Sequence, residues 1–229
     1  MAGRAGVLAL QGAFREHCRA LRDVGLDAVE VRVPADLDGV DGLVIPGGES
    51  TTMSKLIAIY GLEEPILDLH RRGGALFGTC AGMILLAASA VDGRPDQRSL
   101  GLIDLEVRRN AYGRQVSSFE APVRIAGEDL PMHGIFIRAP RIERMGEGVE
   151  AVATLDGDPV AARQGSVMPA WSGSTGRFSR PSSAASRAAR WGSRRSPWRS
   201  ARSPTPSRMS TSPTCSSSGC SSERRAAGS

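Results

Sequence analysis

The sequence predicts an α/β fold with a mostly parallel central sheet flanked by helices, followed by a β-rich second half. Up to about residue 90, short apolar runs that end in turn residues alternate with segments of helical periodicity. From about residue 101, strand patterns follow one another directly. Alternating strands and helices imply βαβ units and therefore parallel strands. The chain has 229 residues, 41% of them hydrophobic, which suffices for a packed core.

The sequence pattern of the first half of the chain predicts four strands and four helices. Residues 14–25 illustrate the helical pattern, because Phe14, Cys18 and Leu21 recur about one turn apart and Gly25 supplies a stop signal. A pair of glycines and hydroxyl side chains suited to capping stand at the start of the helix near Thr51. The expected strands are 6–10, 28–33, 43–46 and 75–77, and the expected helices are 14–25, 51–61, 63–74 and 81–89.

The second half predicts strands without intervening helices, and we find no internal repeat. The expected strands are 102–109, 117–126, 133–139, 149–155, 159–164 and 166–171. This pattern stops at about residue 171, which predicts one domain over residues 1–171.

Residues 172–229 differ in composition from the rest of the chain. They contain 19 Ser and 11 Arg, one acidic residue (Glu223), and no Leu, Ile or Val. A segment without aliphatic residues cannot offset the entropy of ordering, so we expect a disordered Ser/Arg-rich tail. Two origins stay open: a tail that contacts nucleic acid or anionic surfaces, and out-of-frame translation of GC-rich DNA.

The net charge of +5 combines this basic tail with an acidic body. Residues 1–171 hold 18 basic and 23 acidic side chains, so the high pI does not indicate nucleic-acid binding by the body.

The sequence contains no run of about 18 apolar residues, so it predicts no membrane helix. The N-terminal apolar stretch leads directly into Gln11 and charged residues, which is typical of a first strand and not of a signal peptide. Four cysteines in a chain of this length do not suggest a disulfide framework, and we expect a cytoplasmic protein.

Residues 75–87, ALFGTCAGMILLA, place a cysteine at the turn between an apolar strand and a helix. Residues 78–82 have the form G-x-C-x-G, the cysteine counterpart of the G-x-S-x-G nucleophile elbow. The N-terminus of the following helix is expected to lower the pKa of the Cys80 thiol, and the N–H of Ala81 is free to stabilise an oxyanion. The plain alternative is a buried core cysteine before an ordinary helix.

A second strand ends in a glycine-rich turn within residues 43–53, LVIPGGESTTM. In a parallel sheet both turns lie at the carboxyl edge of the strands, where α/β proteins form their sites. Gly47 and Gly48 allow the backbone to approach a ligand closely, and the N–H of Gly48 would complete an oxyanion hole with that of Ala81. For this turn the plain alternative is a capped helix start.

Five motifs together resemble the glutaminase subunits of pyridoxal 5′-phosphate synthase, a branch of the class I (triad) glutamine amidotransferases. The motifs are LALQGAFREH, LVIPGGESTTM, LFGTCAG, RNAYGRQVSSFEA and IFIRAP, and the resemblance runs from about Gly6 to Val167. GTCAG alone indicates the broader class, whereas PGGEST, RNxxGRQ and FIRAP point to this branch. The resemblance implies a class I glutamine amidotransferase-like fold for residues 1–171.

The resemblance also implies an activity and a partner. The activity is hydrolysis of L-glutamine to glutamate and ammonia. The ammonia would pass to a barrel-shaped synthase subunit that assembles pyridoxal 5′-phosphate from ribose 5-phosphate and glyceraldehyde 3-phosphate. No metal or organic cofactor is expected in the glutaminase, since the Cys, His, Asp and Glu residues do not cluster at ligand spacing.

The site residues follow from the same resemblance. Cys80 matches the nucleophile, with Gly48 and Ala81 at the oxyanion hole. Gln11 falls in the first-strand motif, near the partner interface and the site. The residues that match glutamine contacts are Gly48, Glu49, Ser50, Arg109, Ile137 and Arg138. The two arginines could instead be solvated surface charges, and Glu49 a carboxylate at a helix start.

The segment that carries the base in this family is missing. There, the histidine and the carboxylate that orients it stand in a Phe-His-Pro-Glu segment just after the last strand. Here the chain continues WSGSTGRFSRPSS, and the two positions hold Gly173 and Thr175. The only histidines, His17, His70 and His133, match none of it. Because aliphatic residues vanish at the same place, a frameshift near codon 168 would account for both observations.

Two further functions stay open. A glutaminase-like module that docks on the synthase without catalysis would suit the missing His-Pro-Glu segment. A nucleic-acid binder would use the basic residues of 172–229 and would show salt-dependent affinity. Nucleic acid and membrane are not among the partners that we expect for the body.

Overall fold

The computed structural model describes residues 3–93, 97–109, 111 and 118–171. The predicted tail, 172–229, and most of the middle of the RNAYGRQVSSFEA motif lie outside these residues. The helices are α1 (Phe14–Asp23), α2 (Ser50–Ile59), α3 (Glu63–Arg71) and α4 (Ala81–Leu86), with a 3-10 turn, η1 (Pro34–Leu37). The strands are β1 (Arg4–Leu8), β2 (Asp27–Val31), β3 (Gly42–Ile45), β4 (Ala75–Thr79), β5 (Ala87–Val91), β6 (Ile103–Arg108), β7 (Phe119–Ile125), β8 (Met132–Phe136), β9 (Arg141–Met145), β10 (Glu150–Leu155), β11 (Asp158–Arg163) and β12 (Val167–Ala170).

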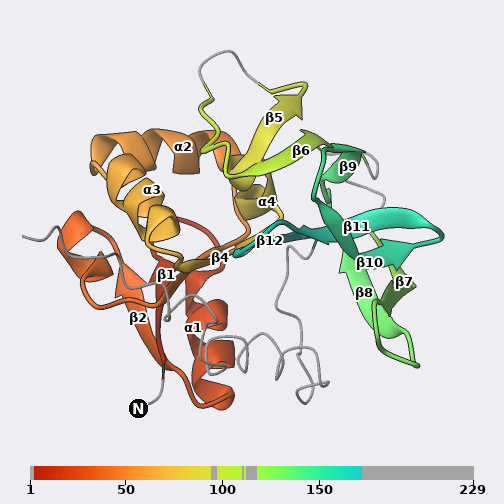
Figure 1. The fold of residues 1–229 in the computed structure, drawn as a ribbon, viewed down its shortest axis with the longest axis horizontal. Helices are drawn as coiled ribbons and strands as arrows, with labels where there is room; N and C mark the ends of the chain where they lie inside the picture. The colour runs from red at the N-terminus through yellow and green to blue at the C-terminus, as the bar shows by residue number, and fades with distance from the viewer. Residues whose placement is uncertain (1–2, 94–96, 110, 112–117, 172–229) are drawn as a thin grey trace, which may run out of the picture. The chain divides into compact units, whose positions relative to one another are not determined.

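A nine-stranded sheet runs through the described residues in the order β2-β1-β3-β4-β12-β11-β10-β7-β8 (Figure 1). The strands from β2 to β12 pair in parallel, and those from β12 to β8 pair antiparallel. A second sheet has the order β5-β6-β9. The predicted fold class, α/β with parallel strands flanked by helices and a β-rich second half, is confirmed, and the antiparallel strands of the second half extend the parallel ones into one large mixed sheet.

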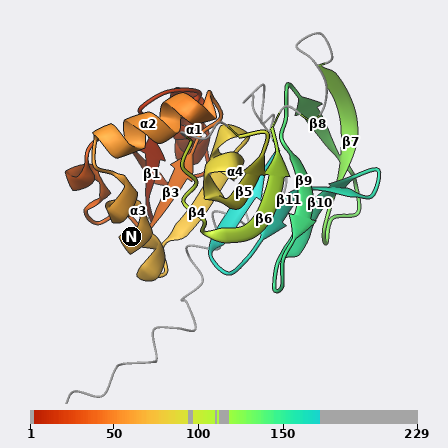
Figure 2. The same ribbon diagram turned by 90° about the horizontal axis from the view of Figure 1, so that it is seen from above.

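Helices cover both faces of the parallel strands (Figure 2). On one face Val7 and Val44 pack with Cys18 of α1. On the other face Leu43 and Leu76 belong to a core that takes in α2, α3 and α4. Neighbouring residues of a strand point to opposite faces of the sheet. Because helices cover both faces here, these short strands are apolar at nearly every position.

Three expectations about elements were wrong. The helix expected over 81–89 ends at Leu86, and the chain continues as β5, whose partner is β6. Strand β9 was not expected, because its sequence, RIERM, contains only two apolar residues among three charged ones. The strand expected over 133–139 ends at Phe136, and Arg138 follows with a left-handed φ of 47°.

The two glycines of the G-x-C-x-G motif are required by packing. A Cβ on Gly82 would overlap the carbonyl oxygen of Ile45 in β3, and one on Gly78 would lie 2.6 Å from the carbonyl carbon of Gly82. Neither position has room for a side chain unless the backbone moves, and protein interiors relax only partly. Helix α4 therefore lies directly against β3 and β4, and this close approach fixes the turn at Cys80.

We predict that Gly82→Ala destabilises the fold by about 1–3 kcal/mol or more, because the added methyl group has no free space. Gly3→Ala is the matched control, since its Cβ would meet its nearest atoms at 3.6 Å, an ordinary contact. Urea unfolding at equilibrium measures both changes. Equal midpoints for the two variants would contradict this account of the motif.

Candidate active site

Cys80 lies at a sharp turn between β4 and α4. It precedes the first residue of α4 and has φ 50° and ψ −100°, a conformation that a non-glycine residue adopts only when its surroundings impose it. Its N–H donates to the carbonyl oxygen of Ala170 in β12 at 3.0 Å, and its own carbonyl accepts from the N–H of Ile84 at 3.2 Å. This is the strained strand-to-helix turn of a nucleophile elbow, as the sequence predicted.

The environment of the Cys80 thiol differs from the expectation. Burial raises the pKa of this thiol, and the N–H of Ala81 and the positive charge of Arg138 lower it by less. The prediction that the pKa of Cys80 lies below the ordinary value is therefore wrong. The positive charge of Arg138, one of the predicted glutamine contacts, nevertheless favours the thiolate form of Cys80.

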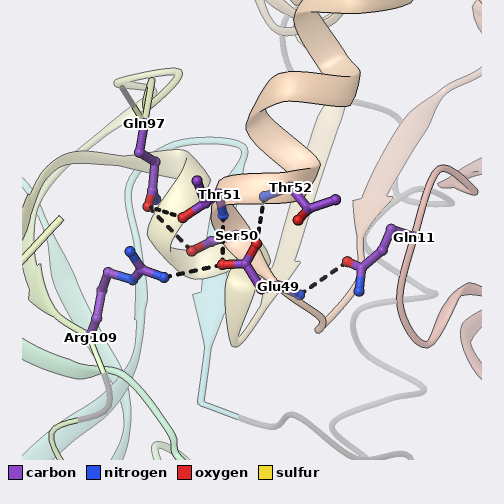
Figure 3. Close-up of polar contacts among 7 residues, drawn as sticks. All are labelled: Gln11, Glu49, Ser50, Thr51, Thr52, Gln97 and Arg109. Atoms are coloured by element: carbon purple, nitrogen blue, oxygen red, sulfur yellow. Dashed lines mark hydrogen bonds and ion pairs between the residues drawn. The ribbon is translucent and has the colours of Figure 1, made fainter. Parts of the chain in front are cut away.

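Two hydrogen bonds join the loop before α1 to the turn before α2. The N–H of Ala13 donates to the carbonyl oxygen of Gly47 at 3.0 Å. The N–H of Glu49 donates to Oε1 of Gln11 at 3.0 Å (Figure 3). A Cβ on Gly48 would overlap Oε1 of Gln11. The side chain of Gln11 thus holds the turn on which Gly48 lies.

The sequence predicts the backbone N–H groups of Gly48 and Ala81 as oxyanion donors. Within the part of the chain that the structure describes, neither the N–H of Gly48 nor that of Ala81 donates to a backbone carbonyl. The neighbouring N–H of Glu49 is already bonded to Gln11. Both predicted oxyanion donors thus lack a backbone acceptor among the described residues, although the N–H of Ala81 hydrogen-bonds the Cys80 thiol.

Glu49 caps α2 with its side chain. Its carboxylate accepts from the N–H groups of Thr51 and Thr52 at 3.1 and 2.6 Å and from Nη2 of Arg109 at 3.3 Å (Figure 3). Burial raises the pKa of Glu49, but the hydrogen bonds from Thr52 and Thr51 outweigh it and lower the pKa to about 2. In this structure two of the predicted glutamine contacts, Glu49 and Arg109, thus bind each other.

Sequence reasoning missed Gln97, which lies beside the same helix start. Its Oε1 accepts from the hydroxyl groups of Ser50 and Thr51 at 3.5 and 3.2 Å (Figure 3). Its Nε2 is buried without a partner among the described residues. No signal in the sequence singles out Gln97, since its segment has neither a motif nor a periodic pattern.

The remaining predicted contacts lie just after β8. Ile137 is 41% exposed, and Arg138 follows with its left-handed backbone. Of the predicted glutamine contacts, Glu49 and Arg109 are joined by an ion pair, and Arg138 acts on Cys80 through its charge.

None of the three histidines hydrogen-bonds Cys80. His17 bonds Oγ1 of Thr79 at 3.1 Å through Nε2, and His133 bonds Glu120 at 2.8 Å. Nδ1 of His70 is buried without a partner among the described residues. The base that the family places after the last strand is not replaced by any of these side chains in the described arrangement.

Strand β12 ends beside the nucleophile. Ala170 pairs with Thr79, and the next residue, Trp171, is buried and stacks on Phe136 at 5.8 Å between ring centroids. Phe136 in turn stacks on Phe119 at 4.8 Å. These rings fix the point at which the chain leaves the sheet, close to Cys80.

The described residues hold neither a metal-binding cluster nor a membrane-spanning helix. Among them, no group of three or more His, Cys, Asp or Glu side chains is arranged to hold a metal ion. Within the same residues, no helix has the length and apolar character required to span a bilayer.

The α/β fold and the strained turn at Cys80 are those of the glutamine amidotransferase class. The sequence matches the SNO glutamine amidotransferase family over residues 7–172, and the chain belongs to this family.

Its relatives carry a more specific name. The Pyridoxal 5′-phosphate synthase subunit PdxT of Mycobacteroides abscessus is 56% identical over 163 residues, which cover 71% of this chain and 84% of the relative. The subunit of the same name from Deinococcus radiodurans is 54% identical over 166 residues, 71% of this chain and 85% of that one.

Solved structures agree with this assignment. A crystal structure of a glutamine amidotransferase is 50% identical and has a TM-score of 0.68, over 72% of this chain and 87% of its own. PurLQS from Thermotoga maritima, 17% identical with a TM-score of 0.58 over 75% of this chain and 87% of its own, supports the fold alone.

We predict that Glu49→Gln removes a pH-dependent part of the stability. The folded pKa of about 2 lies below the ordinary 4.5, so the contribution is complete above about pH 4.5 and is lost as the pH falls toward about 2. The effect is modest, because the side chain is half exposed.

The measurement is the urea midpoint between about pH 7 and about pH 2. Glu147→Gln, at an exposed carboxylate of another loop, is the control. Parallel pH curves for the unaltered chain and Glu49→Gln would contradict the capping role.

Proposed function

We propose that this chain is a glutaminase subunit that hydrolyses L-glutamine to glutamate and ammonia for pyridoxal 5′-phosphate synthesis. The observation that carries the proposal is the strained elbow at Cys80, in a chain 54–56% identical to several proteins called PdxT. The chain spans more than four-fifths of the length of these relatives.

The first chemical step is attack of Cys80 Sγ on the side-chain carboxamide carbon of glutamine. The carbonyl oxygen takes the negative charge and accepts hydrogen bonds from the N–H groups of Gly48 and Ala81. Collapse of the adduct expels the amide nitrogen, which needs a proton to leave as ammonia. Water then hydrolyses the thioester to glutamate and restores the thiol.

The charged residues near the elbow bind the amino acid part of glutamine in this proposal. Arg109 and Arg138 supply positive charge for the α-carboxylate, and Glu49 supplies negative charge for the α-amino group. Ser50 and Ile137 provide the remaining contacts. Glu49 and Arg109 also bind each other, so binding of glutamine's charged groups would compete with that ion pair.

A base must collect the thiol proton and return it to the leaving nitrogen. The family resemblance puts it two residues beyond Trp171, and two residues of chain reach at most about 7 Å. The closeness of β12 to Cys80 supports that position. We therefore propose that residues 1–171 form the glutaminase domain and that residues 172–229 do not belong to it. A frameshift would explain why the His-Pro-Glu segment is absent.

The expected partner is the synthase subunit that consumes the ammonia. The relatives' name, synthase subunit, supports an assembly of this kind, and we propose a barrel-shaped partner and a cytoplasmic location. The comparisons do not support the alternative of an inactive glutaminase-like module. Nothing in the described residues favours nucleic-acid binding.

We predict that restoring the base raises turnover by about 10²–10⁴-fold, the usual contribution of general acid–base catalysis. The restored chain carries Ser172→Phe, Gly173→His, Ser174→Pro and Thr175→Glu, with an in-frame terminal helix. Glutamate release, with the synthase subunit present, compares it with the unaltered chain. Equal rates would show that the base lies elsewhere and would make His17, His70 and His133 the residues to mutate.

We predict that Cys80→Ala in the restored chain lowers turnover on the order of 10⁶-fold, as removal of a protease nucleophile does. Cys18→Ala is the matched control, because Cys18 is the other described free cysteine and lies in α1, packed against Val7 and Val44 of the sheet. Turnover that survives Cys80→Ala but falls with Cys18→Ala would overturn the assignment of the nucleophile.

A further inference from the structure

A buried histidine is tied to the residue that precedes the nucleophile. His17, in α1, is 7% exposed, and Thr79, the last residue of β4, is 3% exposed. Nε2 of His17 and Oγ1 of Thr79 are 3.1 Å apart. The two residues are 62 positions apart in the sequence, so this hydrogen bond joins two separate elements.

His17 is neutral at physiological pH. Burial lowers its pKa, the nearby Glu16 raises it by less, and the result is about 4. A neutral imidazole has one donor and one acceptor nitrogen, so it can bond a hydroxyl group whichever tautomer is present. A buried bond of this kind is costly to break, because each partner would be left without water or another partner.

The strained backbone of Cys80 needs support from several directions. A residue at φ 50° and ψ −100° keeps that conformation only where its surroundings determine it. The glycines at 78 and 82 admit α4, and the Cys80 N–H is bonded to β12. The bond from His17 adds support from α1, which lies on the face of the sheet opposite to α2, α3 and α4.

We propose that His17 is a positioning residue for Cys80: it holds Thr79, and through Thr79 it keeps the Sγ atom aligned with the oxyanion donors. The proposal rests on the proposed function, because it takes Cys80 as the nucleophile. His17 is not the base in this proposal, since its hydrogen bond is made to Thr79.

The test measures how fast Cys80 is labelled, which requires no glutaminase turnover. The probe is a diazo ketone analogue of glutamine, whose carbon forms a bond to Sγ as N₂ leaves and the thiol proton passes to that carbon. Mass spectrometry of the full chain gives the maximal labelling rate and the half-saturating probe concentration. The variants are His17→Ala and Thr79→Val, with His17→Gln and Thr79→Ser as conservative partners that keep a polar group.

We expect His17→Ala and Thr79→Val each to lower the maximal rate by about tenfold to a hundredfold, the effect of misplacing a reacting atom. The half-saturating concentration should stay within about twofold, because the glutamine contacts are untouched. His17→Gln and Thr79→Ser should recover most of the rate. The double variant should lose no more than either single variant, since both remove one hydrogen bond.

Thr79→Val keeps the shape of the side chain, so it reports on the hydrogen bond even where His17→Ala fails to fold. An unchanged maximal rate in folded Thr79→Val overturns the positioning role alone. An unaltered chain in which the probe labels Cys18 in preference to Cys80 overturns the proposed function and this inference with it.

Discussion

The forced backbone conformation of Cys80 is the constraint on which the rest of the site depends. A residue held at φ 50° is unfavourable on its own, so it needs neighbours that leave no alternative. Two positions without a Cβ let α4 approach β3 and β4, and the Cys80 N–H is bonded to β12. The turn then presents Sγ and the N–H of Ala81 at one edge of the sheet, which is the arrangement that acyl transfer from an amide requires.

The second turn is organised by polar contacts. Gln11 accepts from the N–H of Glu49, and the carboxylate of Glu49 occupies the N–H groups at the start of α2. Together they leave the N–H of Gly48 as the donor without a backbone acceptor in the described residues. The capping hydrogen bonds also keep Glu49 ionised, so a negative charge is fixed at the start of α2.

What the sequence predicts well is what local sterics decide. The spacing of glycines around Cys80 predicts the elbow because only small residues fit so tight a turn, and apolar runs covered on both faces predict the parallel strands. What it does not predict depends on distant partners. Ala87–Val91 has helix-forming alanines but pairs with β6, and the pKa of Cys80 follows the burial that the whole fold imposes. Gln97 and the His17–Thr79 bond join segments far apart in the chain, so no local pattern signals them.

The most direct test of the central claim is a crystal structure of the full chain after reaction with the diazo ketone analogue of glutamine. The account predicts an adduct on Sγ of Cys80, a positive φ at that residue, and the adduct oxygen within hydrogen-bonding distance of the N–H groups of Gly48 and Ala81. An adduct on another cysteine, or an adduct oxygen that neither N–H group contacts, would contradict it.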